Sequence, residues 1–360
     1  MTDLPPERPQ FDVIAGEGPA GEPPKQLLSG MSVANEPSVV EIDEVFAAAD
    51  LTPTADLTPT AERTPASASY SRRVALPAVL FGLTCLSTFW AGACQGSPSN
   101  VLAIFADNQE VLKILAAGWG DGLTYMLAVM AILLAHELGH FVQAVRNHVP
   151  ASFPMFIPMP LTPLGTMGAV IAMQGGRADR RQLFDIGITG PLAGLIVAIP
   201  IAWMGIARAV PENPLLAEPI VFENPLLMQV MVRWLRPGMP GDQTFLFNPL
   251  LRAAWVGMLI TGLNMLPISQ LDGGHVVYAL FGRRSRILAW GVVAAAVIFM
   301  VLTSEYIWVV MLLVVIAIGV SHRPTADDSA PLGLGRRIIG ALSLTIPLFC
   351  FHPHAIREIG

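Results

Sequence analysis

Long runs of apolar residues alternate with short polar segments along most of this 360-residue chain. A membrane-spanning helix needs about 20 predominantly apolar residues, and several of these runs approach or exceed that length. They cover Val74–Ala93, Leu112–Phe141, Ile186–Ile206, Leu250–Leu266, Ile287–Val301, Tyr306–Val320 and Ile338–Phe351. The pattern therefore predicts an all-α polytopic membrane protein with about six to seven transmembrane helices.

One apolar stretch, Phe153–Gly176, does not fit a continuous helix. It is interrupted by Pro154, Pro158, Pro160 and Pro163, and then by Gly165 and Gly168. Non-helical backbone at membrane depth is tolerated only where protein or a water-filled cavity covers it, so we expect a short re-entrant β-like hairpin next to a functional site. The free edge of a strand at Met167–Met173 would pair with an extended substrate. The residues expected to form this substrate strand are Met167, Gly168, Ala169, Val170 and Ile171. A proline-rich surface loop is the alternative.

The amino-terminal region, residues 1–70, differs in composition from the runs that follow. It is rich in Pro, Ala, Thr and Glu and holds twelve acidic against three basic residues, so its net charge is −9 while the remainder carries +3. Such a segment buries too little apolar surface to offset its ordering entropy, and we expect a disordered acidic tail. A regulatory docking segment is the alternative. Neither part has the basic patch typical of a protein that binds nucleic acid.

Overall composition agrees with a place in the lipid bilayer. Hydrophobic residues make up 53% and charged residues 13% of the chain, values that a soluble domain of this length rarely shows. If Arg72 and Arg73 lie on the same side as the tail, twelve arginines fall on that side and six lysines or arginines on the other. By the positive-inside rule we expect the tail on the cytoplasmic side. The expected location is a bacterial-type plasma (inner) membrane.

The second apolar run ends in LLAHELGHF at Leu133–Phe141. His136 and His140 are four residues apart, so in a helix both imidazoles project from one face, about 6 Å apart along the axis. Glu137 completes the H-E-x-x-H arrangement, in which two histidines bind Zn²⁺ and the glutamate acts as general base. Ionisable side chains within a membrane helix are costly and usually functional. A packed pair of histidines without metal is the alternative.

Catalytic zinc takes three protein ligands and leaves one position for water, so a third ligand is expected. The fourth run leads into NMLPISQLDGGH at Asn264–His275, which brings Asp272 to the same membrane face as the histidines, near the cytoplasm. Other acidic candidates are placed worse: Asp121, Asp185, Glu223 and Asp242. Asp272 is therefore the predicted third ligand of a single Zn²⁺, with a helix cap as the alternative role. The remaining histidines are expected to be polar surface residues rather than ligands: His148, His275, His322, His352 and His354.

Small residues occur at two informative places. The third run contains Gly190-Pro191-Leu192-Ala193-Gly194 near its start. We expect Pro191 in the first helical turn, where proline is tolerated, and we expect the small residues to let the His136 helix approach closely. The two glycines after Asp272 are expected to free the backbone there.

Four motifs occur in a characteristic order: HELGH, GTMGA at Gly165–Ala169, GPLAG, and NMLPISQLDGGH. As a set they resemble the site-2 protease family of intramembrane zinc metalloproteases, peptidase family M50, over about Leu123–Gly282. The sequence shows no recognisable PDZ insertion, and in this respect it resembles the branch of the family shared by cyanobacteria and chloroplasts. The expected divisions are the tail (1–70), a first transmembrane helix and outer loop (71–110), the catalytic core (111–282) and accessory C-terminal transmembrane helices (283–360).

The resemblance implies hydrolysis of a peptide bond within or near a transmembrane segment, with His136, His140 and Asp272 binding zinc and Glu137 activating water. It also implies that Asn264 holds the substrate or the developing oxyanion. The implied partners are the lipid bilayer, a single-span membrane protein as substrate, and an upstream site-1-type protease that trims this substrate first.

Two other functions remain open. A non-catalytic membrane transporter or substrate-holding pseudoprotease would use the same charged groups as a proton or ion pathway. The intact Glu137 argues against this function, because binding alone needs no general base. A different membrane zinc peptidase with a glutamate as third ligand would retain zinc after Asp272→Ala.

Overall fold

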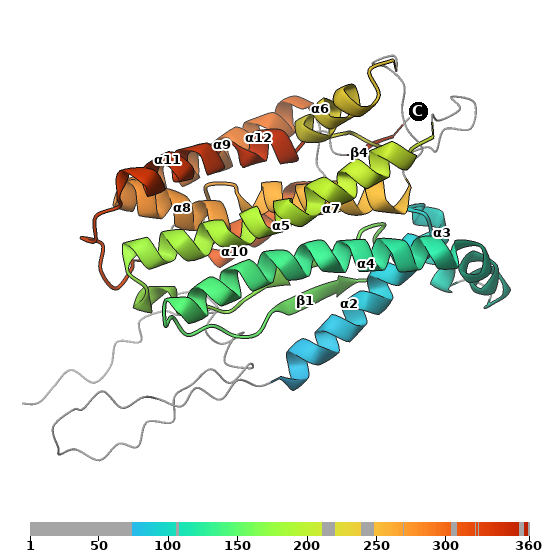
Figure 1. Ribbon diagram of the computed structural model, residues 1–360, viewed down its shortest axis with the longest axis horizontal. Coiled ribbons are helices and arrows are strands. Elements are labelled where there is room, and N and C mark those ends of the chain that lie inside the picture. The colour runs from blue at the N-terminus through green and yellow to red at the C-terminus, as the bar shows by residue number, and fades with distance from the viewer. Residues whose placement is uncertain are drawn as a thin grey trace, which may run out of the picture. The chain divides into compact units, whose positions relative to one another are not determined.

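The computed structural model describes residues 74–105, 108–210, 220–238, 248–268, 270–303, 308–320, 322, 324–352 and 356–358 (Figure 1). The tail expected at residues 1–70 lies outside them. The longer helices are α2 (Ala75–Ala93), α4 (Asn108–Arg146), α5 (Arg180–Arg208), α7 (Pro249–Asn264) and α9 (Ser285–Thr303). The shorter helices are α3 (Pro98–Leu102), α6 (Leu226–Leu235), α8 (Asp272–Phe281), α10 (Val309–Ile318), α11 (Leu334–Ser343) and α12 (Ile346–Cys350), with 3₁₀ turns η1 (Ala103–Phe105), η2 (Gly175–Arg177) and η4 (Gly282–Arg284). The strands pair as β1 (Met155–Met159) with β2 (Gly165–Val170) and β3 (Ile220–Phe222) with β4 (Ile356–Glu358).

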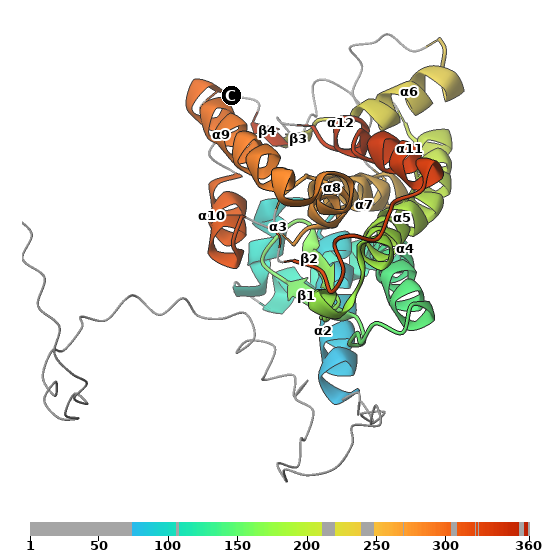
Figure 2. The ribbon, with the colours of Figure 1, turned by 90° about the vertical axis from the view of Figure 1, so that its left-hand side faces the viewer.

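Four segments in the described part of the chain are helical, long and apolar enough to cross a membrane. They are Ala75–Ala93, Asn108–Arg146, Arg180–Arg208 and Asp272–Thr303, the last of which contains α8, η4 and α9. At Gly282, where φ is 58°, the chain turns, so α8 and α9 point in different directions (Figure 2). The mostly helical fold expected from the apolar runs is confirmed, whereas the expected number of six to seven spans is not. The fourth run forms a shorter helix, α7, of 16 residues.

Helices α4, α5 and α7 pack against one another at the centre of the described bundle. Helix α2 packs on α4, and α8 packs on α5. The largest cluster of buried apolar side chains joins these helices through Tyr125 and Ile132 of α4, Ile206 of α5, and Met258 of α7. Helices α4 and α7, which carry predicted site residues, therefore belong to the central packing, and α8 joins it through α5.

Helix α5 begins earlier than the apolar run suggested. The Asp179 side chain accepts hydrogen bonds from the backbone N–H groups of Arg181 and Gln182, and the Gln182 side chain accepts one from the Asp179 N–H. This capping box starts the helix immediately after Asp179. The expectation that Pro191 lies in the first turn is therefore wrong, because Pro191 lies inside α5.

The last apolar run, expected as one short span over Ile338–Phe351, forms two helices. The non-helical residues 344–345 separate α11 from α12. Pro347, in the first turn of α12, has no backbone N–H with which to continue the hydrogen bonds of α11. Arg336 of α11 donates hydrogen bonds to both carboxylate oxygens of Asp185, each at 2.8 Å, and so fastens α11 to the start of α5.

Strands β1 and β2 form the antiparallel hairpin expected between α4 and α5, rather than a surface loop. The paired residues are Met155 with Val170, Phe156 with Ala169, Pro158 with Thr166, and Met159 with Gly165. Two side chains hold the turn: the Tyr125 hydroxyl donates to the Leu164 carbonyl at 2.8 Å, and the Ser87 hydroxyl donates to the Gly165 carbonyl at 2.6 Å. Both α2 and α4 therefore fix the position of the hairpin.

Removal of the Tyr125 hydroxyl is expected to weaken this anchor. Tyr125 is 1% exposed, and Tyr125→Phe leaves the Leu164 carbonyl without its donor, which costs about 1–3 kcal/mol of unfolding free energy. Denaturant unfolding in detergent micelles, followed by circular dichroism, measures the loss. Thr124→Val is the matched control, because the Thr124 hydroxyl bonds to Gly120 of its own helix. An equal loss in both variants would contradict the anchor.

Candidate metal centre

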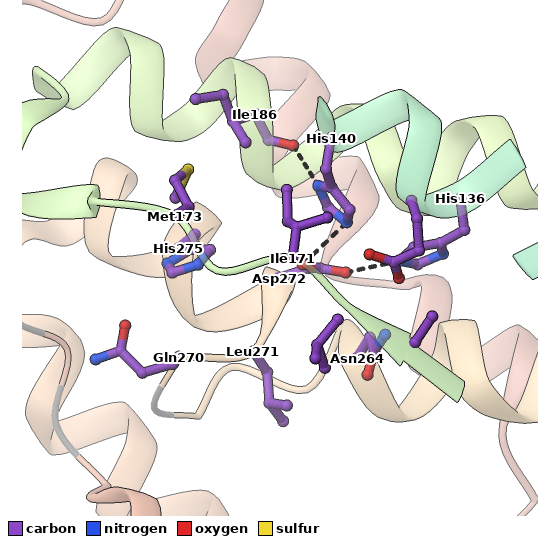
Figure 3. Close-up of a pocket in the computed structure, with 13 residues that line it drawn as sticks. His136, His140, Ile171, Met173, Ile186, Asn264, Gln270, Leu271, Asp272 and His275 are labelled. Carbon is purple, nitrogen blue, oxygen red and sulfur yellow. Dashed lines mark hydrogen bonds and ion pairs between the residues drawn. The ribbon is translucent and has the colours of Figure 1, made fainter. Parts of the chain in front are cut away.

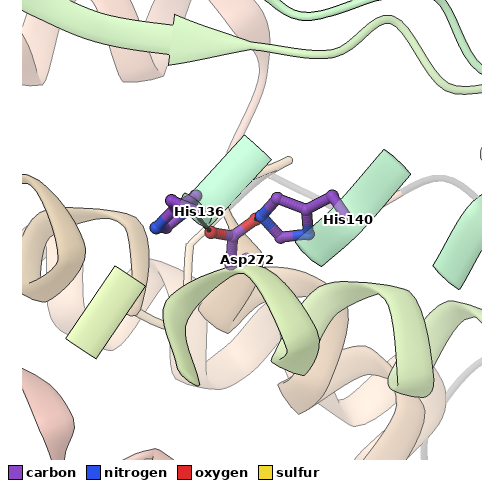
Figure 4. A group of neighbouring side chains, drawn as sticks. All are labelled: His136, His140 and Asp272. Carbon is purple, nitrogen blue, oxygen red and sulfur yellow. Dashed lines mark hydrogen bonds and ion pairs between the residues drawn. The ribbon is translucent and has the colours of Figure 1, made fainter. Parts of the chain in front are cut away.

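Helix α4 carries His136, Glu137 and His140 towards its C-terminal end, and α8 begins with Asp272. Asp272 Oδ2 lies 3.1 Å from His136 Nε2, and Asp272 Oδ1 lies 3.2 Å from His140 Nε2. One ligand atom from each of these three residues lies within 4.8 Å of the others (Figure 4). The structure thus brings together the three side chains that the sequence analysis proposed as metal ligands, from segments far apart in the chain.

The three side chains fit a divalent metal. Two imidazole nitrogens and one carboxylate oxygen are donors that zinc uses in catalytic sites, where three protein ligands leave a further position open. His136, Glu137 and His140 are 2%, 3% and 5% exposed, so packed protein surrounds the cluster. Within the described residues, no other group of three His, Cys, Asp or Glu side chains comes as close together.

Helix α5 orients His140. The Nδ1–H of His140 donates to the Ile186 carbonyl oxygen, 2.8 Å away, because a carbonyl can only accept. In the neutral imidazole this leaves Nε2 unprotonated and able to bind a metal, and Nε2 is the atom that contacts Asp272. Thr189 joins the same two helices, since its hydroxyl lies 3.1 Å from the Gly139 carbonyl and 3.0 Å from the Ile186 carbonyl.

The glycines of GPLAG make room for the histidines. A Cβ atom at Gly190 would overlap the imidazole of His140, and a Cβ atom at Gly194 would lie 3.2 Å from His136 Nδ1. The expected close approach of this segment to the histidine helix is confirmed. The helices approach closely because Gly190 and Gly194 have no side chains, and the imidazole rings of the histidines fill that space.

Asp272 lies in the first turn of α8, after the segment that separates α8 from α7. The N-cap of α8 is Leu271, and the Asp272 carboxylate turns to the histidines instead of capping the helix. The positive end of the helix dipole favours a carboxylate at this position. Gly273 has helical backbone, so the expectation that it frees the backbone is wrong; a Cβ atom there would overlap the Met265 carbonyl, and glycine permits this close approach.

The cluster lines a cavity of about 130 Å³ (Figure 3). Its lining residues are His136, Glu137, His140, Ala169, Val170, Ile171, Met173, Ile186, Asn264, Gln270, Leu271, Asp272 and His275. Three residues of the expected substrate strand, Ala169, Val170 and Ile171, are among them, whereas Met167 and Gly168 are not. Asn264 lines the cavity from the end of α7.

Two polar lining residues, Gln270 and His275, have no role in the sequence analysis. The expectation that His275 is a polar surface residue is wrong: it lines the cavity, and its Nδ1 lies 2.6 Å from His322 Nε2. The available signal was its spacing of three residues from Asp272, because positions i and i+3 of a helix are neighbours on one face. His354 lies outside the described residues.

Crowding of His140 is expected to weaken metal binding. Gly190→Ala places a Cβ atom where the imidazole lies and displaces the ring, so the affinity for metal falls by about 10- to 100-fold, the range found when ligand orientation is disturbed. Chelator competition on the purified protein measures this affinity. Gly120→Ala is the matched control, because a Cβ atom at Gly120 has no heavy atom within 4 Å. Unchanged affinity in Gly190→Ala would contradict the packing described here.

Residues 124–304 of this chain match peptidase family M50. Probable zinc metalloprotease EGY2, chloroplastic, of Arabidopsis thaliana is 29% identical over 238 residues, which cover 64% of this chain and 41% of that protein. Probable zinc metalloprotease EGY1, chloroplastic, of Arabidopsis thaliana is 29% identical over 276 residues, which cover 73% and 50%. The EGY1 protein of Oryza sativa subsp. japonica is 31% identical over 220 residues, which cover 57% and 37%.

No solved structure matches the chain. The chain spans between 37% and 50% of the length of these three curated relatives. The family match covers half of the chain and contains His136, Glu137, His140 and Asp272. On this match, the chain belongs to peptidase family M50, the site-2 protease family.

Proposed function

We propose that this chain is a membrane zinc metalloprotease of the site-2 type, which hydrolyses a peptide bond within or near a transmembrane segment of a membrane-tethered substrate. The observation that carries the proposal is the approach of His136, His140 and Asp272 to one another, with Glu137 lining the same cavity. The names of the chloroplastic relatives, each a probable zinc metalloprotease, support it. The presence of the cavity among membrane-length helices supports a reaction within the membrane.

Each residue of the centre has a distinct role. His136, His140 and Asp272 hold one Zn²⁺, which when bound supplies a Lewis acid for water and for the scissile carbonyl. Glu137 accepts a proton from the attacking water and passes it to the leaving amine nitrogen. Asn264 donates a side-chain N–H to the substrate carbonyl oxygen as negative charge develops there.

The substrate binds in an extended conformation. A transmembrane helix has its backbone groups engaged in internal hydrogen bonds, so it unwinds locally before hydrolysis. Strand β2 pairs with β1 along one edge, and no other strand among the described residues pairs with its second edge. The unwound segment adds along this edge as a third strand, next to Ala169, Val170 and Ile171.

The chain crosses a bacterial-type plasma (inner) membrane about six to seven times, with α7, α10 and the α11–α12 pair completing the four long segments. The metal centre lies near the cytoplasmic face, on the side of the tail. Arginines support this orientation: Arg146 ends α4, Arg180 begins α5, and Arg336 lies in the first turn of α11. The partners are a single-span substrate and an upstream site-1-type protease that trims it first.

Zinc content and cleavage of a single-span reporter, measured on the purified full chain in detergent, test the proposal. Wild type is expected to bind about one zinc ion and to cleave. Glu137→Gln is expected to keep zinc and to lower the cleavage rate at least about 100-fold, because general base catalysis contributes a factor of that size or more. Asp272→Ala is expected to lose both, since two histidines alone hold zinc weakly. Removal of zinc with a chelator is expected to stop cleavage, and added zinc restores it.

Asp121→Asn is the matched control, because Asp121 also lies on α4 but accepts a hydrogen bond from Gln95 and does not line the cavity. A wild-type chain without zinc, or a Glu137→Gln variant that cleaves like wild type, would overturn the protease mechanism in favour of a transporter or a substrate-holding pseudoprotease. If the Asp272→Ala variant retains zinc, the third ligand is a residue other than Asp272.

A further inference from the structure

His275 forms part of the cavity wall but has no role in the mechanism above. It follows Asp272 by three residues on α8, so the two side chains project from neighbouring positions on one face of the helix. In the view of Figure 3, His275 and His136 lie on opposite sides of Asp272, and Met173 lines the same cavity. The cavity therefore extends beyond the metal ligands and reaches a further imidazole.

Neighbouring groups hold this imidazole in place. Helix α5 packs closely against it, since a Cβ atom at Gly187 would lie 2.9 Å from His275 Cβ. His275 Nδ1 lies 2.6 Å from His322 Nε2. The His322 ring in turn stacks on the Tyr278 ring, with centroids 4.5 Å apart, and the Tyr278 hydroxyl donates to Asp328 at 2.8 Å. The His275 ring is thus preorganised in the cavity wall.

The hydrogen bond between the two imidazoles uses one proton and can run in either direction. When His275 donates from Nδ1, its Nε2 is an acceptor; when His322 donates, His275 Nε2 carries a proton and is a donor. A hydroxyl or a carboxamide can both donate and accept, so it matches either state. Gln270 lines the same cavity and has the same dual capacity.

Charged and aliphatic side chains fit this part of the cavity less well. The carboxylates of Asp272 and Glu137 offset the two positive charges of a bound zinc ion. No net electrostatic attraction then compensates the free-energy cost of removing a charged substrate group from water. An aliphatic side chain would cover the imidazole and the carboxamide without replacing their hydrogen bonds to water. The matching class is an uncharged polar side chain.

We propose that His275 and Gln270 form a substrate subsite for an uncharged hydrogen-bonding side chain, namely serine, threonine, asparagine or glutamine. This inference rests on the proposed function, because the side chain belongs to the extended segment that adds to β2. Beyond β2 the chain continues through Ile171 to Met173, and both residues line the cavity together with Asp272 and His275 (Figure 3). A segment aligned with it places a residue at a fixed distance from the scissile bond against His275.

The experiment measures binding separately from cleavage. In a set of single-span reporters, one position at a time along the cleaved segment carries asparagine, leucine or aspartate. Competition binding is measured on the full-length Glu137→Gln chain, and cleavage is measured on wild type. At one fixed position, asparagine is expected to bind and to be cleaved roughly three- to tenfold better than leucine or aspartate, which corresponds to one net hydrogen bond.

Variants separate this preference from the easier unwinding of a segment that contains asparagine. His275→Leu is expected to abolish the preference at that position, and His275→Gln is expected to keep most of it, because glutamine also donates and accepts. His148→Leu is the matched control and keeps the full preference, since His148 is exposed beyond the end of α4. The zinc content of each variant reports whether its metal centre is intact.

Three results would overturn the subsite: equal binding of the three reporters at every position, a preference that survives His275→Leu, or an equal loss in His275→Gln and His275→Leu. A wild-type chain that holds no zinc or does not cleave overturns the proposed function instead. The binding comparison on the Glu137→Gln chain still decides the subsite in that case.

Discussion

The packing of imidazoles and carboxylates among apolar helices is the constraint on which the rest of the structure depends. Removing such groups from water is costly unless each finds a partner. Asp272 contacts both histidines, and the second nitrogen of His140 is bonded to the Ile186 carbonyl. These contacts require α5 to pack closely on both α4 and α8. Gly190 on α5 leaves space for the His140 imidazole. The break between α7 and α8 places Asp272 at the start of a helix, from which its carboxylate reaches both histidines.

The interruption between α7 and α8 also decides what surrounds the metal centre. In a continuous helix through this region, Asp272 would lie in the middle of the helix, where the backbone N–H and C=O groups are already hydrogen-bonded to one another. Ending α7 at Asn264 and starting α8 at Asp272 places an amide and a carboxylate at two helix termini that line one cavity. The β1–β2 hairpin forms another wall of this cavity, and its strands supply backbone groups that helices cannot offer.

Local patterns in the sequence were sufficient for much of this arrangement. The spacing of His136 and His140 determines their shared face, and the prolines of the 153–176 stretch exclude a helix there. The apolar run places the start of α5 too late, because the capping box lies in a polar segment outside the run. The spacing from Asp272 indicates the helix face of His275, but its contact with His322 spans 47 residues and no local pattern reports it. Pairings between distant segments depend on packing of the whole bundle, which a linear pattern does not contain.

The separation of 136 residues between His136 and Asp272 has a consequence for the order of biosynthesis. Amino-terminal segments leave the ribosome first, so α2, α4 and the hairpin are available to associate before α8 has been made. His136, Glu137 and His140 are therefore made well before Asp272, the third member of the cluster. A nascent or prematurely terminated chain has the two histidines without Asp272, so the three-residue cluster is complete only after the start of α8 has been made.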